Sequence, residues 1–117
     1  MGVGMPQALL LQRFGQLIKD AFGETPYQVG SSLESKTGWR DVDVRVILSD
    51  ADYERLGFGD PVNPHCNAKW VALVLAFSTL GREMTGLPID FQIQQQTLAN
   101  KQPHGKRSAL FVVLEKK

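Results

Sequence analysis

Two aspartates one residue apart alternate with β-branched residues at positions 41–46, in the order Asp41, Val42, Asp43, Val44. Successive side chains of a strand point to opposite faces, so we expect both carboxylates on one face and the valines in the core. Carboxylates held side by side repel each other, and a divalent cation with hard oxygen ligands would relieve that repulsion. These residues therefore predict a strand that carries a Mg²⁺ site.

A third carboxylate lies in a second alternating segment, residues 89–94, where Asp90, Gln92 and Gln94 share the polar side. We expect this segment to form a strand beside the first. Upstream, the pair Gly30-Ser31 predicts a turn whose backbone can approach a ligand closely. Three carboxylates near a turn that can hold phosphates are what a metal-assisted phosphoryl transfer requires.

Each of these residues also has an ordinary structural explanation. Asp41 and Asp43 alone fit the solvated face of a half-exposed strand, and so do Gln92 and Gln94. Arg45 continues the face of the aspartates, where it either contacts phosphate or forms a salt bridge with Asp43. It is the combination of the Asp-x-Asp pair with Gly-Ser and a third aspartate that favours a metal site.

Length and composition limit the possible organisation. The 117 residues fit one domain, spanning 1–117, with 43% hydrophobic and 21% charged residues, which is typical of a globular protein. The formal net charge of +1 provides no global field that would attract nucleic acid or membrane. Any nucleic-acid contact would have to be local.

Cysteine usage and hydropathy indicate the compartment. Cys66 is the only cysteine, so no intramolecular disulfide can form and a reducing environment is expected. The sequence does not begin like a secretory signal, and the longest apolar run, 70–77, is far shorter than the roughly 20 residues of a membrane span. We therefore expect a cytoplasmic protein without membrane contact.

Helical periodicity predicts the elements behind these strands. A helix is expected from Pro6 to Gly23, in which Gly15 is a mild defect. Asp50 is expected to cap a short helix. Residues 69–85 are apolar nearly all round, which predicts a largely buried helix.

Short strands and polar connections complete the expected architecture. Residues 27–29 and 41–48 are predicted strands, and 109–114 a last edge strand. The polar stretch 95–108 is expected to be a loop. The order of elements predicts an α+β fold, close to α/β, with helices packed against a small mixed sheet.

The spacing of these motifs resembles that of the DNA polymerase β-like nucleotidyltransferase superfamily. The family signature is a hydrophobic residue, Gly, then Gly or Ser, about ten residues, and Asp-x-Asp between hydrophobics. It reads here Val29-Gly30-Ser31, nine residues, and Asp41-Val42-Asp43-Val44. The resemblance covers roughly residues 5–95 and implies a minimal nucleotidyltransferase core.

The resemblance implies a role for each matching residue. Asp41 and Asp43 would bind two Mg²⁺ ions, or Mn²⁺, and Asp90 would bind the second metal and help deprotonate the acceptor hydroxyl. Gly30 and Ser31 would hold the triphosphate of an NTP such as ATP. Further candidate nucleotide-binding residues are Ser32, Lys36, Arg40 and Arg45.

The implied activity is transfer of a nucleoside monophosphate from an NTP to a hydroxyl, with release of pyrophosphate. Ser32-Leu33-Glu34 and Arg40 stand where small bacterial members often have Arg, Gly and Ser, so the acceptor, whether protein, nucleic acid or small molecule, stays open.

Two other functions remain possible. One is a binding or antitoxin-like regulatory module that acts through a partner protein or a homo-oligomer, which the short length favours. Another is a nucleic-acid-binding accessory protein using Lys101, Lys106 and Arg107, against which the near-neutral charge argues.

Overall fold

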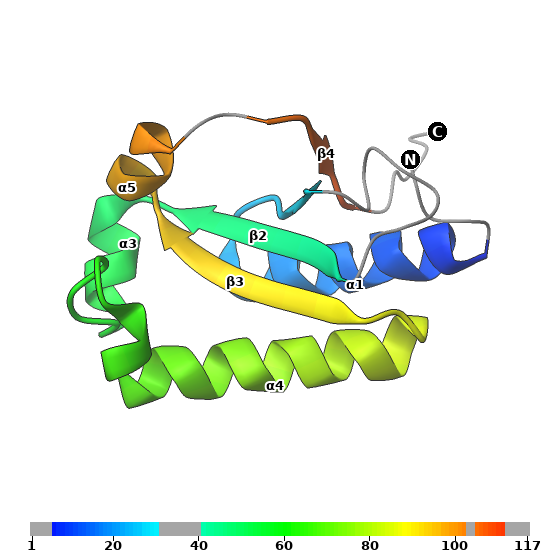
Figure 1. Cartoon of the computed structure of the whole chain (residues 1–117), viewed down its shortest axis with the longest axis horizontal. Coiled ribbons are helices and arrows are strands. Elements are labelled where there is room, and N and C mark those ends of the chain that lie inside the picture. Colours follow the sequence, from blue (N-terminus) through cyan, green and yellow to red (C-terminus); the bar gives the residue numbers. More distant parts are fainter. Residues whose placement is uncertain (1–5, 31–40, 103–104, 112–117) are drawn as a thin grey trace.

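The computed structural model describes residues 6–30, 41–102 and 105–111. Figure 1 shows a small sheet with long helices packed against it. In chain order the elements are α1 (Gln7–Phe22), β1 (Tyr27–Val29), β2 (Val42–Leu48), α3 (Asp50–Arg55), a 3₁₀ turn (Pro64–Cys66), α4 (Ala68–Thr85), β3 (Ile89–Gln95), α5 (Gln96–Lys101) and β4 (Arg107–Ala109).

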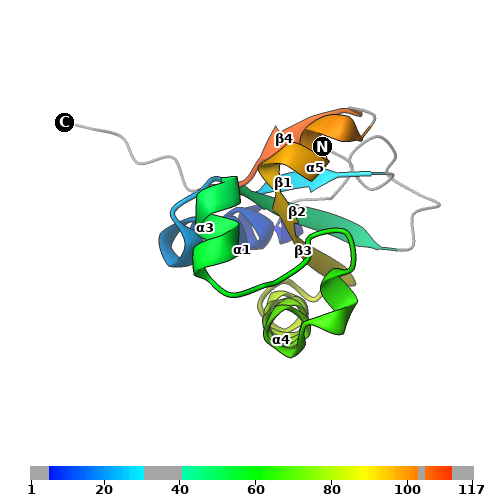
Figure 2. The same cartoon turned by 90° about the vertical axis from the view of Figure 1, so that its left-hand side faces the viewer.

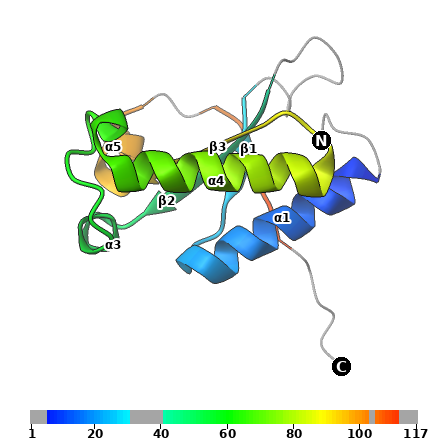
Figure 3. The ribbon, with the colours of Figure 1, turned by 90° about the horizontal axis from the view of Figure 1, so that it is seen from below.

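The four strands form one mixed sheet in the order β3-β2-β1-β4. Strand β1 pairs antiparallel with both β2 and β4, whereas β2 pairs parallel with β3. Helices α1 and α4 lie on the same side of the sheet (Figures 2 and 3). The predicted α+β class, with helices against a small mixed sheet, is confirmed.

The core lies between this sheet and the two long helices. Every second residue of β2 is buried, from Val42 to Leu48, and the same alternation runs along β3. Phe14 of α1 packs edge to face against Phe91 of β3, with 6.4 Å between the ring centroids. The alternation therefore leaves the other face of both strands free of helical cover from α1 and α4.

Helix α4 also forms hydrogen bonds with part of the outer edge of β3. An unpaired edge strand leaves backbone donors and acceptors without partners. Three side chains on one side of α4 supply them: Ser78 Oγ accepts from the Phe91 N–H (3.0 Å), Trp70 Nε1 donates to the Ile93 carbonyl (3.0 Å) and Arg82 Nε donates to the Ile89 carbonyl (3.1 Å). The helix thus fixes which way the residues of β3 face.

The expectation that α4 is largely buried was wrong. Its buried residues are Trp70, Ser78, Gly81 and Thr85, whereas Leu75 is 62% exposed. The apolar pattern runs all round the helix, but the sheet and α1 cover only one side of it.

The polar stretch expected to be a loop contains α5 and the start of β4. The hydrophobic pattern could not predict α5, because the contacts that hold it are polar. Asp50 accepts hydrogen bonds from the backbone N–H and the hydroxyl of Thr97. Asp50 is therefore not the cap of α3; Ser49 is, through its hydroxyl, which accepts from the Asp52 N–H. The last strand spans Arg107–Ala109, so it shares only residue 109 with the expected strand 109–114. Residues 110 and 111 are not in a strand, and residues 112–114 lie outside the described residues.

Gly15 is a packing requirement rather than a defect. A Cβ at this position would overlap the Cβ and the carbonyl oxygen of Leu110, which is fully buried. The absence of a side chain lets α1 approach the chain that follows β4.

The bond between Ser78 and the edge of β3 gives a stability prediction. We expect Ser78→Ala to lower the free energy of unfolding by about 1–3 kcal/mol, because it leaves the Phe91 N–H buried without an acceptor. Urea unfolding measures this, with Thr79→Ala on the exposed side of α4 as a control expected to change stability by less than about 0.5 kcal/mol. Equal effects of the two variants would show that the edge bond does not contribute.

Candidate functional site

The candidate site lies on the face of the sheet opposite α1 and α4. In β2 and β3, the residues that are not in the core alternate with those that are, which places Asp43 and Arg45 on this face beside Asp90 and Gln92. In the parallel register, Asp43 is paired with Asp90 and Arg45 with Gln92. Two of the three predicted carboxylates therefore lie side by side on one face.

The third carboxylate, Asp41, lies one residue before β2 and is exposed. It is close enough to Asp43 for its charge to raise the pKa of that residue. Within ranges 6–30, 41–102 and 105–111, no three His, Cys, Asp or Glu side chains are gathered as a metal site. The carboxylates form a tight pair with a more distant third member.

Gly30 fits closely against this pair. Its φ of 80° lies in the left-handed region that favours glycine, and a Cβ there would overlap Oδ2 of Asp43. Val29, its neighbour, is paired with Asp43 across β1 and β2. Gly30 thus lies close against the Asp43 carboxylate, whereas the predicted approach of its backbone to a ligand stays a prediction.

The electrostatics of Asp43 are unfavourable to its charged form. Burial is the largest cause that raises its pKa, and the charges of Asp90 and Asp41 raise it further. Arg45 opposes these effects, but its Nη2 lies 3.9 Å from Oδ1 of Asp43, which is a loose contact. The carboxylate is therefore only partly neutralised by the protein.

The donor chemistry of the pair fits a hard divalent cation. Carboxylate oxygens are the ligands that Mg²⁺ and Mn²⁺ use in proteins, and a cation would remove the repulsion that raises the pKa of Asp43. Asp43 and Asp90 could hold such an ion, with Asp41 near the same end of β2.

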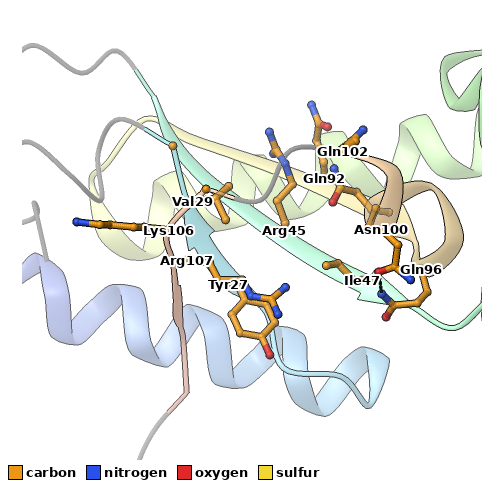
Figure 4. Close-up of a pocket in the computed structure, with 14 residues that line it drawn as sticks. Tyr27, Val29, Arg45, Ile47, Gln92, Gln96, Asn100, Gln102, Lys106 and Arg107 are labelled. Atoms are coloured by element: carbon orange, nitrogen blue, oxygen red, sulfur yellow. Dashed lines mark hydrogen bonds between the residues drawn. The ribbon is translucent and has the colours of Figure 1, made fainter.

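A cavity of about 480 Å³ opens beside the pair, toward α5. Figure 4 shows its lining, with Arg107 stacked over the ring of Tyr27. The guanidinium carbon is 4.6 Å from the ring centroid. Arg45 and Gln92, two residues beyond the carboxylates, line the cavity as well.

The other predicted nucleotide-binding residues, Ser31, Ser32, Lys36 and Arg40, lie outside the described residues. The sequence reasoning did not identify Tyr27, Asn100 and Gln102 as cavity residues, and it assigned Arg107 to a solvated loop. Tyr27 could have been found by alternation, because it shares a face with Val29. The positions of Asn100, Gln102 and Arg107 at the cavity depend on strand pairing and packing between segments that are distant in the sequence.

Comparison with known proteins adds no relative. No family model matches this sequence, and neither the curated proteins nor the solved structures give a significant match.

None of the helices in the described part of the chain has the length and apolarity that a membrane span requires.

The raised pKa of Asp43 predicts an unusual pH dependence of stability. Because its pKa is higher in the folded protein than its ordinary value of 3.8, the fold is stabilised by protonation at low pH, and this contribution is lost as the pH rises through the folded-state pKa. We therefore expect Asp43→Asn to raise the urea midpoint at pH 7 in metal-free buffer, and the gain to disappear below about pH 4.

Asp50→Asn is the matched control for this measurement. Hydrogen bonds from Thr97 lower the pKa of Asp50, so the ionised form stabilises the fold above pH 3.8 and this contribution is lost in acid. The control should lose stability at pH 7. If Asp43→Asn also lost stability at pH 7, the fold would stabilise the charged carboxylate of Asp43, which would contradict the prediction.

Proposed function

We propose that the chain is a Mg²⁺-dependent nucleotidyltransferase of the polymerase β-like superfamily, which transfers a nucleoside monophosphate from an NTP to a hydroxyl acceptor. The single observation that carries this proposal is the pairing of Asp43 with Asp90 on the open face of the sheet, with Gly30 in van der Waals range of Asp43. The motif spacing in the sequence provides the second, independent support.

Each residue has a stated role in this proposal. Asp41 and Asp43 would hold two Mg²⁺ ions, or Mn²⁺, and Asp90 would hold the second ion and accept the proton of the acceptor hydroxyl. The backbone at Gly30 and the hydroxyl of Ser31 hold the triphosphate. The remaining candidates for the triphosphate are Ser32, Lys36 and Arg40; Arg45, which was also predicted to bind phosphate, lines the cavity beyond Asp43.

The reaction is a substitution at the α-phosphorus of the NTP. The acceptor oxygen forms a bond to this phosphorus, the bond to the β-phosphate bridging oxygen breaks, and pyrophosphate leaves with that oxygen and its electron pair. The acceptor proton passes to Asp90. Bound Mg²⁺ would neutralise charge on the phosphates, and the protein contributes mainly orientation.

The raised pKa of Asp43 agrees with this role. A group that is desolvated beside like charges is suited to bind a cation, because the cation replaces an unfavourable arrangement by a favourable one. A reducing, cytoplasmic setting is part of the proposal, in keeping with the single, exposed Cys66.

The alternative is a regulatory module of the same fold that acts through a partner protein. It retains the pocket but carries out no transfer. Release of pyrophosphate by the isolated chain, in the presence of NTP and Mg²⁺, would contradict this alternative.

The metal site gives a direct prediction for Asp43→Asn. We expect Mg²⁺-dependent binding of a nonhydrolysable NTP analogue, measured by calorimetry, to be lost in this variant. Any pyrophosphate release should fall by two orders of magnitude or more, because a metal at the reacting phosphate contributes several kcal/mol, and about 1.4 kcal/mol is tenfold in rate.

Asp20→Asn is the matched control for this loss. Asp20 is exposed on α1, on the other side of the sheet, and bonds only locally to Gln16. The substitution Asp20→Asn removes the same charge as Asp43→Asn and should leave Mg²⁺-dependent NTP binding unchanged. Mg²⁺-dependent NTP binding that survives Asp43→Asn would falsify the proposed metal site.

A further inference from the structure

The cavity beside the carboxylate pair has a chemistry of its own. It lies over the open face of the sheet and is lined by residues of all four strands, by Gly30 and by residues of α5 (Figure 4). Its volume of about 480 Å³ is in the range of small-molecule sites, roughly 300–1,000 Å³. Gly30 is one of its lining residues, so a ligand in this cavity would lie next to a triphosphate held at Gly30.

Two guanidinium groups meet at this cavity from different strands. Arg45 is paired with Tyr27 across β2 and β1, and Arg107 of β4 lies over the ring of Tyr27. Among the described residues that line the cavity there is no Asp or Glu. Two cationic side chains on a wall without carboxylates favour an anion in the cavity.

Arg45 also has an unused donor. Its Nη1 is buried and has no hydrogen-bond partner among the residues that the structure describes. The other terminal nitrogen, Nη2, makes only the 3.9 Å contact to Asp43. A buried donor without an acceptor costs free energy, so a turn of the Arg45 side chain that brings this donor to an oxyanion in the cavity would be favourable.

The rest of the wall is rich in amides. Gln92, Gln94, Asn100 and Gln102 line the cavity, and Asn100 is oriented by a bond from Gln96 (2.7 Å). Amide groups both donate and accept hydrogen bonds, so they suit the neutral, polar parts of a ligand such as sugar hydroxyls or a base edge.

We propose that this cavity is the acceptor subsite, and that the acceptor is a phosphate-bearing molecule whose phosphate is held by Arg45 and Arg107. The assignment as acceptor rests on the proposed function, whereas the binding of a phosphate does not. The charge of the ligand distinguishes it from the NTP: Gly30 and Ser31 are the residues proposed for the triphosphate, and the nucleoside that extends from the triphosphate carries no charge for Arg45 and Arg107 to bind.

The spacing along the strands agrees with this assignment. Arg45 is two residues beyond Asp43 on the same face, and Gln92 is two residues beyond Asp90. Two strand residues span about 7 Å, a gap that a sugar ring between a phosphate and a hydroxyl can bridge. A phosphate held at Arg45 would thus leave a hydroxyl of the same molecule directed to Asp90.

Binding in metal-free buffer without NTP tests the subsite. We expect AMP to bind the wild-type protein and adenosine to bind at least about tenfold more weakly, because adenosine lacks the charge-assisted hydrogen bonds to the phosphate. Arg107→Gln should weaken the binding of AMP by about tenfold or more and leave the binding of adenosine unchanged. Arg13→Gln, which removes the same charge from an exposed position on α1, should bind AMP normally.

Two results would overturn this assignment. One is equal binding of AMP and adenosine to the wild-type protein; the other is normal binding of AMP by Arg107→Gln. Asp43→Asn separates the subsite from the proposed function: AMP binding should persist in this variant while Mg²⁺-dependent NTP binding is lost. AMP binding that disappeared with Asp43 would place the phosphate at the carboxylates and contradict the subsite.

A short single-stranded oligonucleotide identifies the source of the phosphate. It presents a phosphodiester beside a free 3′-hydroxyl, whereas AMP presents a monoester on a small molecule. Tighter binding of the oligonucleotide than of AMP, with the same loss in Arg107→Gln, assigns the subsite to a nucleic-acid end. Binding of AMP alone assigns it to a small phosphorylated acceptor.

Discussion

The parallel pairing of β2 with β3 is the constraint on which the candidate site depends. It sets Asp43 beside Asp90, and a shift of one residue would turn one of the carboxylates into the core. Helix α4 prevents such a shift, because Ser78 and Arg82 bond to specific backbone groups on the outer edge of β3. The same helix supplies the crossover that a parallel pair requires. The position of the carboxylates therefore follows from how α4 packs.

The open face joins two regions of opposite charge. At one end are the carboxylates, where burial and mutual repulsion raise the pKa of Asp43. At the other are Arg45 and Arg107, with a buried donor on Arg45 that has no partner in the described part of the chain. Arg45 also contacts the anionic region, but its Nη2 is 3.9 Å from Oδ1 of Asp43 and neutralises that carboxylate only in part. A cation bound by the carboxylates and an anion bound by the two arginines would neutralise both regions.

Local patterns were sufficient to predict the strands that carry the carboxylates. Alternation depends only on near neighbours, so the predicted bounds of β1, β2 and β3 agree with the observed bounds within a residue. The same alternation predicted that Asp43 and Asp90 lie on one face of the sheet. The cavity could not be predicted in this way. Helix α5 is held by bonds from Thr97 to Asp50, 47 residues apart, and Arg107 reaches Tyr27 only through strand pairing. The exposure of Leu75 likewise depends on what covers α4, which periodicity does not reveal.

Paramagnetic broadening by Mn²⁺ in the nuclear magnetic resonance spectrum, with a nonhydrolysable NTP present, tests the central claim most directly. The carboxylates at the start of β2 and β3 should hold the ion, so we expect the broadening to be centred on Asp43 and Asp90 and to be absent in Asp43→Asn. Broadening centred elsewhere, for instance on the exposed carboxylates of α3, would contradict it. Such a result would leave an α+β fold whose acidic pair serves another purpose.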